Sequence, residues 1–177
     1  FLLLIAVALI GIAADSPNYS EEKGADILSY TVDPSEASLR MFYKDAAGEQ
    51  YNSFRNLKAA VEQEGMELLF AMNGGMYMED RRPLGLYIEA GKEIRGLNTR
   101  DTGHGNFYLQ PNGVFLIHAD GEAEVCPRDE FEQSATVQYA TQSGPMLLID
   151  GDIHSSLTKG SENVHIRNGV GVLPDGR

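Results

Sequence analysis

The sequence lacks several features that define whole classes of proteins. It has one cysteine, Cys126, among 177 residues, so no disulfide can form within the chain. It has no tryptophan, no internal repeat and no low-complexity segment. Hydrophobic residues make up 42% and charged residues 23%, which indicates an ordinary globular protein. A domain of ~150 residues buries roughly 70% of its extended surface, so a core forms without disulfides.

Positive charge is scarce. The chain has 14 Lys and Arg against 26 Asp and Glu, and its formal net charge is -12. Nucleic acids and anionic membrane surfaces are bound by clustered basic side chains, so we expect neither as a partner. A single phosphate group held by one or two arginines is compatible with this charge.

The first 14 residues are uncharged, small and apolar, and the chain begins with Phe1 rather than Met. This pattern predicts a shortened export signal, with small residues at Gly11, Ala13 and Ala14 that suit cleavage. The stretch is shorter than the ~20 residues of a spanning helix, so we expect no stable membrane insertion, with an uncleaved anchor as the alternative. An export signal without a disulfide framework predicts a periplasmic or secreted protein.

Three segments follow from these patterns. Residues 1–14 are the expected signal peptide, residues 15–26 a flexible polar entry segment, and residues 27–177 one domain. Asp175-Gly176 is a hairpin signal without a returning strand. We therefore expect the domain to be cut short at its C-terminal end.

Short apolar runs bounded by turn residues predict many strands and one clear helix, at 52–64, with a shorter helix within 127–133. The expected strands are 27–32, 39–43, 68–72, 84–88, 107–109, 114–117, 123–125, 146–149 and 170–173. Strands do not alternate with long helices, which argues against a doubly wound sheet. The predicted class is α+β, with a twisted mixed, mostly antiparallel sheet and few helices.

The apolar run that begins at Leu68 breaks at Asn73 into Gly74 and Gly75. Glycine pairs permit positive φ and let a ligand approach the backbone closely, because no Cβ is in the way. Alone, this segment is as well explained by an ordinary turn. It becomes informative because similar clusters end other strands.

Four clusters combine glycine or proline with amide side chains. They are Asn73-Gly74-Gly75, Asn106-Phe107 with Pro111-Asn112-Gly113, Gln142-Ser143-Gly144-Pro145, and Arg167-Asn168-Gly169. Side-chain amides and exposed backbone N–H groups suit ligands rich in hydroxyl groups. Arg167 adds a planar cation that can bind a phosphate or carboxylate through two hydrogen bonds. As a set, the clusters predict a sugar-phosphate site.

Other kinds of site are less well supported. Ser143 is not in a G-x-S-x-G turn, which argues against a serine hydrolase triad. No metal is expected, because the four histidines lack the spacing of zinc ligands; they are His104, His118, His154 and His165. We expect Cys126 to be structural. Glu79 and Asp80 can act as acid or base, or can belong to a solvated loop together with Arg81 and Arg82.

Five motifs in order resemble the bacterial exported branch of the phosphodiester glycosidase family, which also contains the mammalian mannose-6-phosphate uncovering enzyme. They are MNGGMY (72–77), PLGLYIEAGKEI (83–94), GNFYLQPNGVF (105–115), ATQSGPMLLIDGDIH (140–154) and RNGVGVLPDGR (167–177). The resemblance runs from about Ile27 to Arg177. Members typically continue through a Leu-Asp-Gly motif that carries a carboxylate and that has no counterpart in this chain.

The resemblance implies hydrolysis of a sugar joined through its anomeric carbon to a phosphodiester, without a cofactor. Arg167 is then expected to bind the phosphate, and Asp80, or an aspartate beyond this chain, to act as the catalytic carboxylate. The expected substrate-binding residues are Asn73, Gly74, Gly75, Gln142, Ser143, Gly144 and Asn168. The alternative is a non-catalytic cell-envelope module that binds a glycan or phosphoglycan through the same loops.

Overall fold

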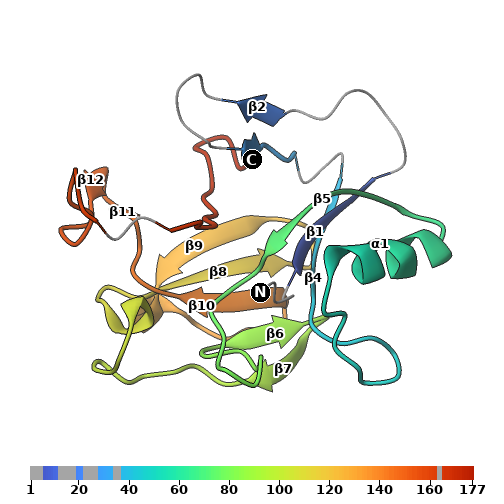
Figure 1. The fold of residues 1–177 in the computed structure, drawn as a ribbon, viewed down its shortest axis with the longest axis horizontal. Coiled ribbons are helices and arrows are strands. Elements are labelled where there is room, and N and C mark those ends of the chain that lie inside the picture. The colour runs from blue at the N-terminus through green and yellow to red at the C-terminus, as the bar shows by residue number, and fades with distance from the viewer. Residues whose placement is uncertain (1–5, 12–18, 22–27, 34–36, 163–164) are drawn as a thin grey trace. The chain divides into compact units, whose positions relative to one another are not determined.

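The computed structural model describes residues 6–11, 19–21, 28–33, 37–162 and 165–177. The chain divides into two compact units. The first comprises Phe1–Gly74, Ile117–Ala123 and Val172–Arg177, and the second comprises Gly75–Leu116 and Glu124–Gly171. Figure 1 labels most of their helices and strands.

The first unit is built on a three-stranded sheet in the order β4 (Ser38–Phe42), β1 (Ala6–Gly11) and β5 (Glu67–Asn73). The middle strand, β1, is antiparallel to both neighbours, as Figure 1 shows. The apolar stretch that predicts an export signal therefore supplies a strand. A second pair, β2 (Tyr19–Glu21) and β3 (Leu28–Tyr30), is also antiparallel.

The helix expected at 52–64 is confirmed as α1 (Phe54–Gln63). The hydroxyl of Ser53 caps it by accepting the backbone N–H of Asn56 at 3.1 Å, and the chain leaves the helix through Gly65 at φ +77°. One face is apolar, and its Leu57 and Val61 are fully buried. They pack against side chains from β4, β5 and the helix flanks: Phe42, Tyr51, Phe54, Met66, Leu68 and Ala71.

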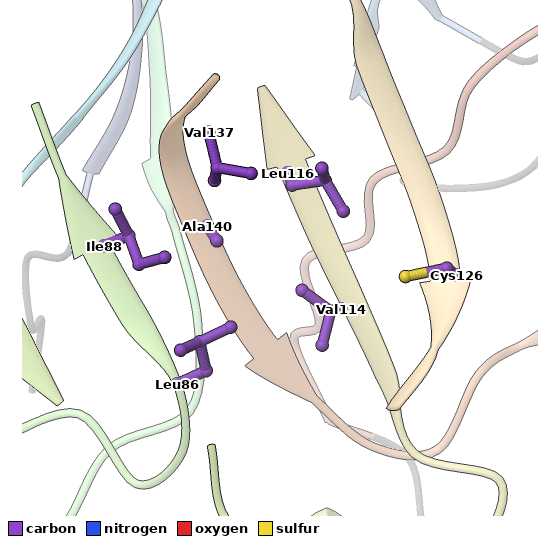
Figure 2. Close-up of a cluster of buried hydrophobic side chains, with 7 residues drawn as sticks. All are labelled: Leu86, Ile88, Val114, Leu116, Cys126, Val137 and Ala140. Atoms are coloured by element: carbon purple, nitrogen blue, oxygen red, sulfur yellow. The ribbon is translucent and has the colours of Figure 1, made fainter. Parts of the chain in front are cut away.

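The second unit contains most of a five-stranded sheet in the order β7 (Lys92–Arg95), β6 (Tyr87–Glu89), β10 (Val137–Ser143), β8 (Gly113–His118) and β9 (Ala123–Pro127). The tip of the β8–β9 hairpin groups with the first unit. β6 is antiparallel to both β7 and β10. Figure 2 shows the core of this sheet, which consists of Leu86, Ile88, Val114, Leu116, Cys126, Val137 and Ala140.

Two expected strands are wrong. Residues 107 and 108 fall in the 3-10 turn η1 (Asn106–Tyr108), which follows Gly105 at φ +96°, and Leu109 caps its end. Residues 170–173 form no strand, and Val170 and Leu173 are 44% and 45% exposed. An apolar run forms a strand only when a neighbouring strand accepts its backbone hydrogen bonds, and no such pairing involves these residues in the part of the chain that the structure describes.

Other elements are shorter than expected or absent from the prediction. The strand expected at 146–149 is reduced to β11 (Leu148–Ile149), which pairs with β12 (Asp152–Ile153). The helix expected within 127–133 is the single turn η2 (Arg128–Glu130). The central strand β10 was not predicted, because polar residues interrupt its sequence and leave no continuous apolar run.

The α+β class is confirmed, because most strands pair antiparallel and α1 is the one α-helix among the described residues. Within those residues, no helix is both long enough and apolar enough to cross a membrane.

Candidate active site

Gln142 lies at the end of β10 and is only 1% exposed. Its carboxamide forms four hydrogen bonds within the second unit. Oε1 accepts the backbone N–H groups of Leu86 at 3.0 Å and Asn98 at 2.9 Å. Nε2 donates to the backbone carbonyl of Asn98 and to Oδ1 of Asn112, both at 2.8 Å. The side chain thus pairs with the backbone of Asn98 as a neighbouring strand would.

The partners of Gln142 determine the orientation of both buried amides. Backbone N–H groups can only donate, so the atom that faces Leu86 and Asn98 must be the Gln142 oxygen. The Gln142 nitrogen then faces Asn112, which must present its own oxygen. The Asn112 nitrogen consequently donates to the carbonyl of Phe107 at 2.6 Å. We call Gln142, Asn112 and Asn98 the amide network.

Two of the predicted glycines lie against this part of β10. A Cβ on Gly144 would lie 2.6 Å from Asn112 Nδ2 and would overlap the carbonyl oxygen of Phe107. A Cβ on Gly75 would overlap the hydroxyl oxygen of Thr141. The structure therefore brings Gly75, Gln142 and Gly144 together around one strand end.

A buried arginine is attached to the same network. Arg128 donates its backbone N–H to the carbonyl of Asn112 at 2.8 Å. Its guanidinium, whose side chain is 8% exposed, donates to Asp101 at 2.9 Å and to Asp129 at 2.8 Å. These two hydrogen bonds raise the pKa of Arg128, so it stays charged. Nη1 is buried and has no hydrogen-bond partner among the described residues.

Asp80 lies in the loop after the glycine pair and outside the amide network. Its carboxylate accepts the backbone N–H of Arg82 at 3.1 Å and the Arg82 Nε–H at 2.6 Å. The backbone hydrogen bond, and then the guanidinium, hold the pKa of Asp80 below its usual value of 3.8. Asp80 is therefore ionised at neutral pH.

The remaining predicted residues are placed as follows. Arg167 and Asn168 are exposed and follow β12 without belonging to a helix or strand. Ser143 ends β10 directly after Gln142. Asn73 ends β5 in the first unit, where its Oδ1 is buried and has no hydrogen-bond partner among the described residues. Gly74, which follows it, is buried.

The described residues contain no group of three or more His, Cys, Asp and Glu side chains placed to hold a metal ion. Cys126 is buried, and burial, together with the charges of Glu124 and Glu130, raises the pKa of its thiol to about 11. It packs in the core of the five-stranded sheet (Figure 2).

The family model for phosphodiester glycosidase matches residues 66–177. The chain belongs to the phosphodiester glycosidase family. This match covers β5, the glycine pair and the whole second unit, and it includes every residue predicted for the site. Membership in the family supports a glycosidase-type function on phosphodiesters.

One curated relative aligns with nearly the whole chain. The chain is 37% identical over 176 residues to an uncharacterized protein, YigE, of Escherichia coli strain K12. The aligned region covers 99% of this chain and 68% of the relative. No solved structure matches the chain.

Sequence reasoning missed two members of the arrangement. Asn98 lies between Leu97 and Thr99 in a segment without a motif, and no sequence signal marks it. The sequence pattern places Arg128 only within an expected short helix. Asn112 belonged to one of the four predicted clusters, but its role as the partner of Gln142 depends on residues 30 positions apart in the chain.

Proposed function

We propose that this chain is an exported hydrolase that cleaves a sugar from a glycosyl-1-phosphodiester and yields the free sugar and a phosphomonoester. The observation that carries this proposal is the family match over residues 66–177. The clusters Asn73-Gly74-Gly75, Gln142-Ser143-Gly144 and Arg167-Asn168 all lie within that range.

The leaving group explains which residues the reaction needs. A phosphomonoester has its second pKa near ~6, so it departs as a stable anion and requires less protonation than an alcohol. The larger requirements are to hold the phosphate and to stabilise positive charge at the anomeric carbon. The carboxylate of Asp80 suits the stabilisation of positive charge at the anomeric carbon, because it is ionised and therefore negatively charged at neutral pH.

In this proposal Arg167 binds the phosphate. Arg167 is exposed in the segment after β12. Asn73, Gly74 and Gly75 supply an amide and backbone N–H groups, and Ser143, Gly144 and Asn168 contact the sugar or the phosphate. The net charge of -12 repels an anionic substrate, so a local cation is required.

The test compares Arg167→Ala, Arg167→Lys and the unmodified protein on a panel of glycosyl-1-phosphodiesters, with free sugar and phosphomonoester both measured. We expect Arg167→Ala to lower kcat/KM by about 10²–10³-fold, as loss of a charge-stabilising group does, and Arg167→Lys to restore part of it. Arg55→Ala is the control, because Arg55 is an exposed arginine on α1 of the first unit.

Two results would count against the proposal. Unchanged turnover in Arg167→Ala would remove Arg167 from the site. If the unmodified protein bound phosphoglycans but released no sugar from any member of the panel, the non-catalytic binding module would be the better description.

Export rests on the apolar N-terminal stretch alone. Removal of residues 1–14 would take away β1, the middle strand of the first unit's sheet. Fractionation of cells that express the complete gene tests the location, and N-terminal sequencing of the product shows whether β1 is retained. Protein found only in the cytoplasm would overturn this part of the proposal.

A further inference from the structure

We infer that Gln142 and Asn112 are positioning residues, which fix the end of β10 against the chain at Leu86, Asn98 and Phe107 without contacting the substrate. The geometric part of this inference stands on the hydrogen bonds of the amide network. Its consequence for catalysis rests on the proposed function. The sequence alone predicted a substrate contact for Gln142, so the inference changes the role of that residue.

The first argument is that Gln142 has no polar capacity left for a ligand. Its two amide hydrogens go to Asn98 and Asn112, and its oxygen accepts from Leu86 and Asn98. A primary amide has two donors and two acceptor sites, so all four are used. With 1% of the residue exposed, a substrate would have to displace these partners to reach the amide.

The second argument is the number of separate segments that the network joins. Gln142 lies on β10, Leu86 immediately precedes β6, and Asn98 follows β7. Asn112 immediately precedes β8, and its amide extends the network to the carbonyl of Phe107 in η1. The hydrogen bonds of Gln142 join residues that are far apart in the sequence, so each of them fixes one segment relative to another.

The third argument is that the network also fixes the loop between β7 and η1. Asn98 donates its Nδ2–H to the carbonyl of Leu84 at 3.1 Å and accepts the backbone N–H of Arg100 at 3.2 Å. Further along, Asp101 pairs with the buried Arg128, whose backbone N–H binds the carbonyl of Asn112. Ser143 and Gly144, which directly follow Gln142, therefore have positions set by a connected set of buried and partly buried hydrogen bonds.

The test uses two substitutions. Gln142→Glu keeps the shape and the oxygen that accepts the N–H groups of Leu86 and Asn98. It places a carboxylate oxygen against the carbonyl of Asn98 and Oδ1 of Asn112, where an N–H group had been. Gln142→Met keeps the length and adds no charge, so it remains informative if the first variant folds poorly. Gln133→Glu is the matched control, since it makes the same chemical change at an exposed position.

Amide hydrogen exchange provides a readout that does not depend on activity. In Gln142→Met we expect exchange at Leu86 and Asn98 to be at least about tenfold faster, because both N–H groups lose their acceptor. The amide of Leu57 in α1, which donates to Ser53, should be unchanged and reports on global unfolding. Unchanged protection at Leu86 and Asn98 would overturn the inference.

Sugar release then tests the catalytic consequence. Per folded molecule, we expect Gln142→Met to lower kcat by about tenfold or more with a smaller change in KM, because orientation is lost and no binding contact is removed. Gln142→Glu should recover activity as the pH falls, because a protonated carboxyl group can again donate one hydrogen bond. A rise in KM with kcat unchanged would indicate direct substrate binding and would overturn the positioning role.

The two proposals fail in different ways. If the unmodified protein releases no sugar but the exchange at Leu86 and Asn98 responds to Gln142→Met, the proposed function fails and the structural part of the inference stands. If exchange responds and kcat per folded molecule does not, the positioning role fails and the proposed function stands.

Discussion

Gly85 and Gln142 are in direct contact: a Cβ on Gly85 would lie 2.5 Å from Oε1 of Gln142. The same Cβ would lie 2.7 Å from Cζ of Phe107. Both neighbours are buried, and the Gln142 side chain is held by four hydrogen bonds. Position 85 therefore has no room for a side chain.

We expect Gly85→Ala to lower the free energy of unfolding by about 1–3 kcal/mol, the usual cost of overpacking a buried site. Urea denaturation followed by circular dichroism measures this change. Gly171→Ala is the matched control, because nothing lies within 4 Å of the Cβ position at Gly171. Equal stability of the two variants would mean that the strand end repacks without cost.

The N-terminal cap of α1 gives a second prediction. Ser53→Ala removes the oxygen that accepts the Asn56 N–H and should lower the free energy of unfolding by about 1 kcal/mol. Ser53→Asp supplies another capping oxygen and should retain most of the stability. If both variants lose the same amount, the hydroxyl contributes through some contact other than the cap.

The ionisation of Asp80 can be followed by carboxyl ¹³C NMR during a pH titration. We expect a midpoint below 3.8, because Arg82 stabilises the charged form through its backbone N–H and its guanidinium. Arg82→Gln removes the guanidinium and keeps the backbone donor, which is the larger cause, so the midpoint should rise only part of the way. A complete return to 3.8 would show that the backbone hydrogen bond has no effect.

This shift also fixes the direction of the pH dependence. The folded-state pKa of Asp80 is lowered, so its contribution to stability is present above pH 3.8 and is lost as the pH falls through the lower folded value. Because Asp80 is exposed, salt should screen this contribution. Thermal melting between pH 5 and pH 2, with Asp80→Asn as the reference, measures it.

Cys126 should be chemically inert in the folded protein. With its pKa raised to about 11, roughly one thiol in a thousand is ionised at pH 8, and the side chain is buried in the sheet core. An aromatic disulfide reagent should therefore react slowly with native protein and stoichiometrically after denaturation in guanidinium chloride. Rapid reaction of the native protein would show that β9 opens readily.

Local patterns predicted the elements whose signals lie within a short window. The spacing of Phe54, Leu57 and Val61, with Ser53 before them and Gly65 after them, was sufficient for α1. The tight turn at Ala90-Gly91 between β6 and β7 is likewise local, and both of its residues have positive φ. In each case the amino acids that define the element are neighbours in the chain.

Elements without such local signals were missed. β10 has no continuous apolar run because Thr141 and Gln142 are polar, yet both are buried. A buried polar residue is stable only when distant groups satisfy it, and sequence spacing does not reveal those groups. Conversely, residues 170–173 have strand-forming side chains and form no strand, because strand formation depends on a pairing partner.

The sequence by itself determined the α+β class, the helix, the turns and the family, since these depend on local patterns and on motifs in order. The tertiary structure decided the hydrogen-bond partners of Gln142. Its type and position suggested a ligand contact, whereas the fold places Leu86, Asn98 and Asn112 around its amide and uses all of its hydrogen-bonding capacity. A polar side chain binds whichever groups the fold brings within about 3 Å, and that choice is made only when distant segments meet.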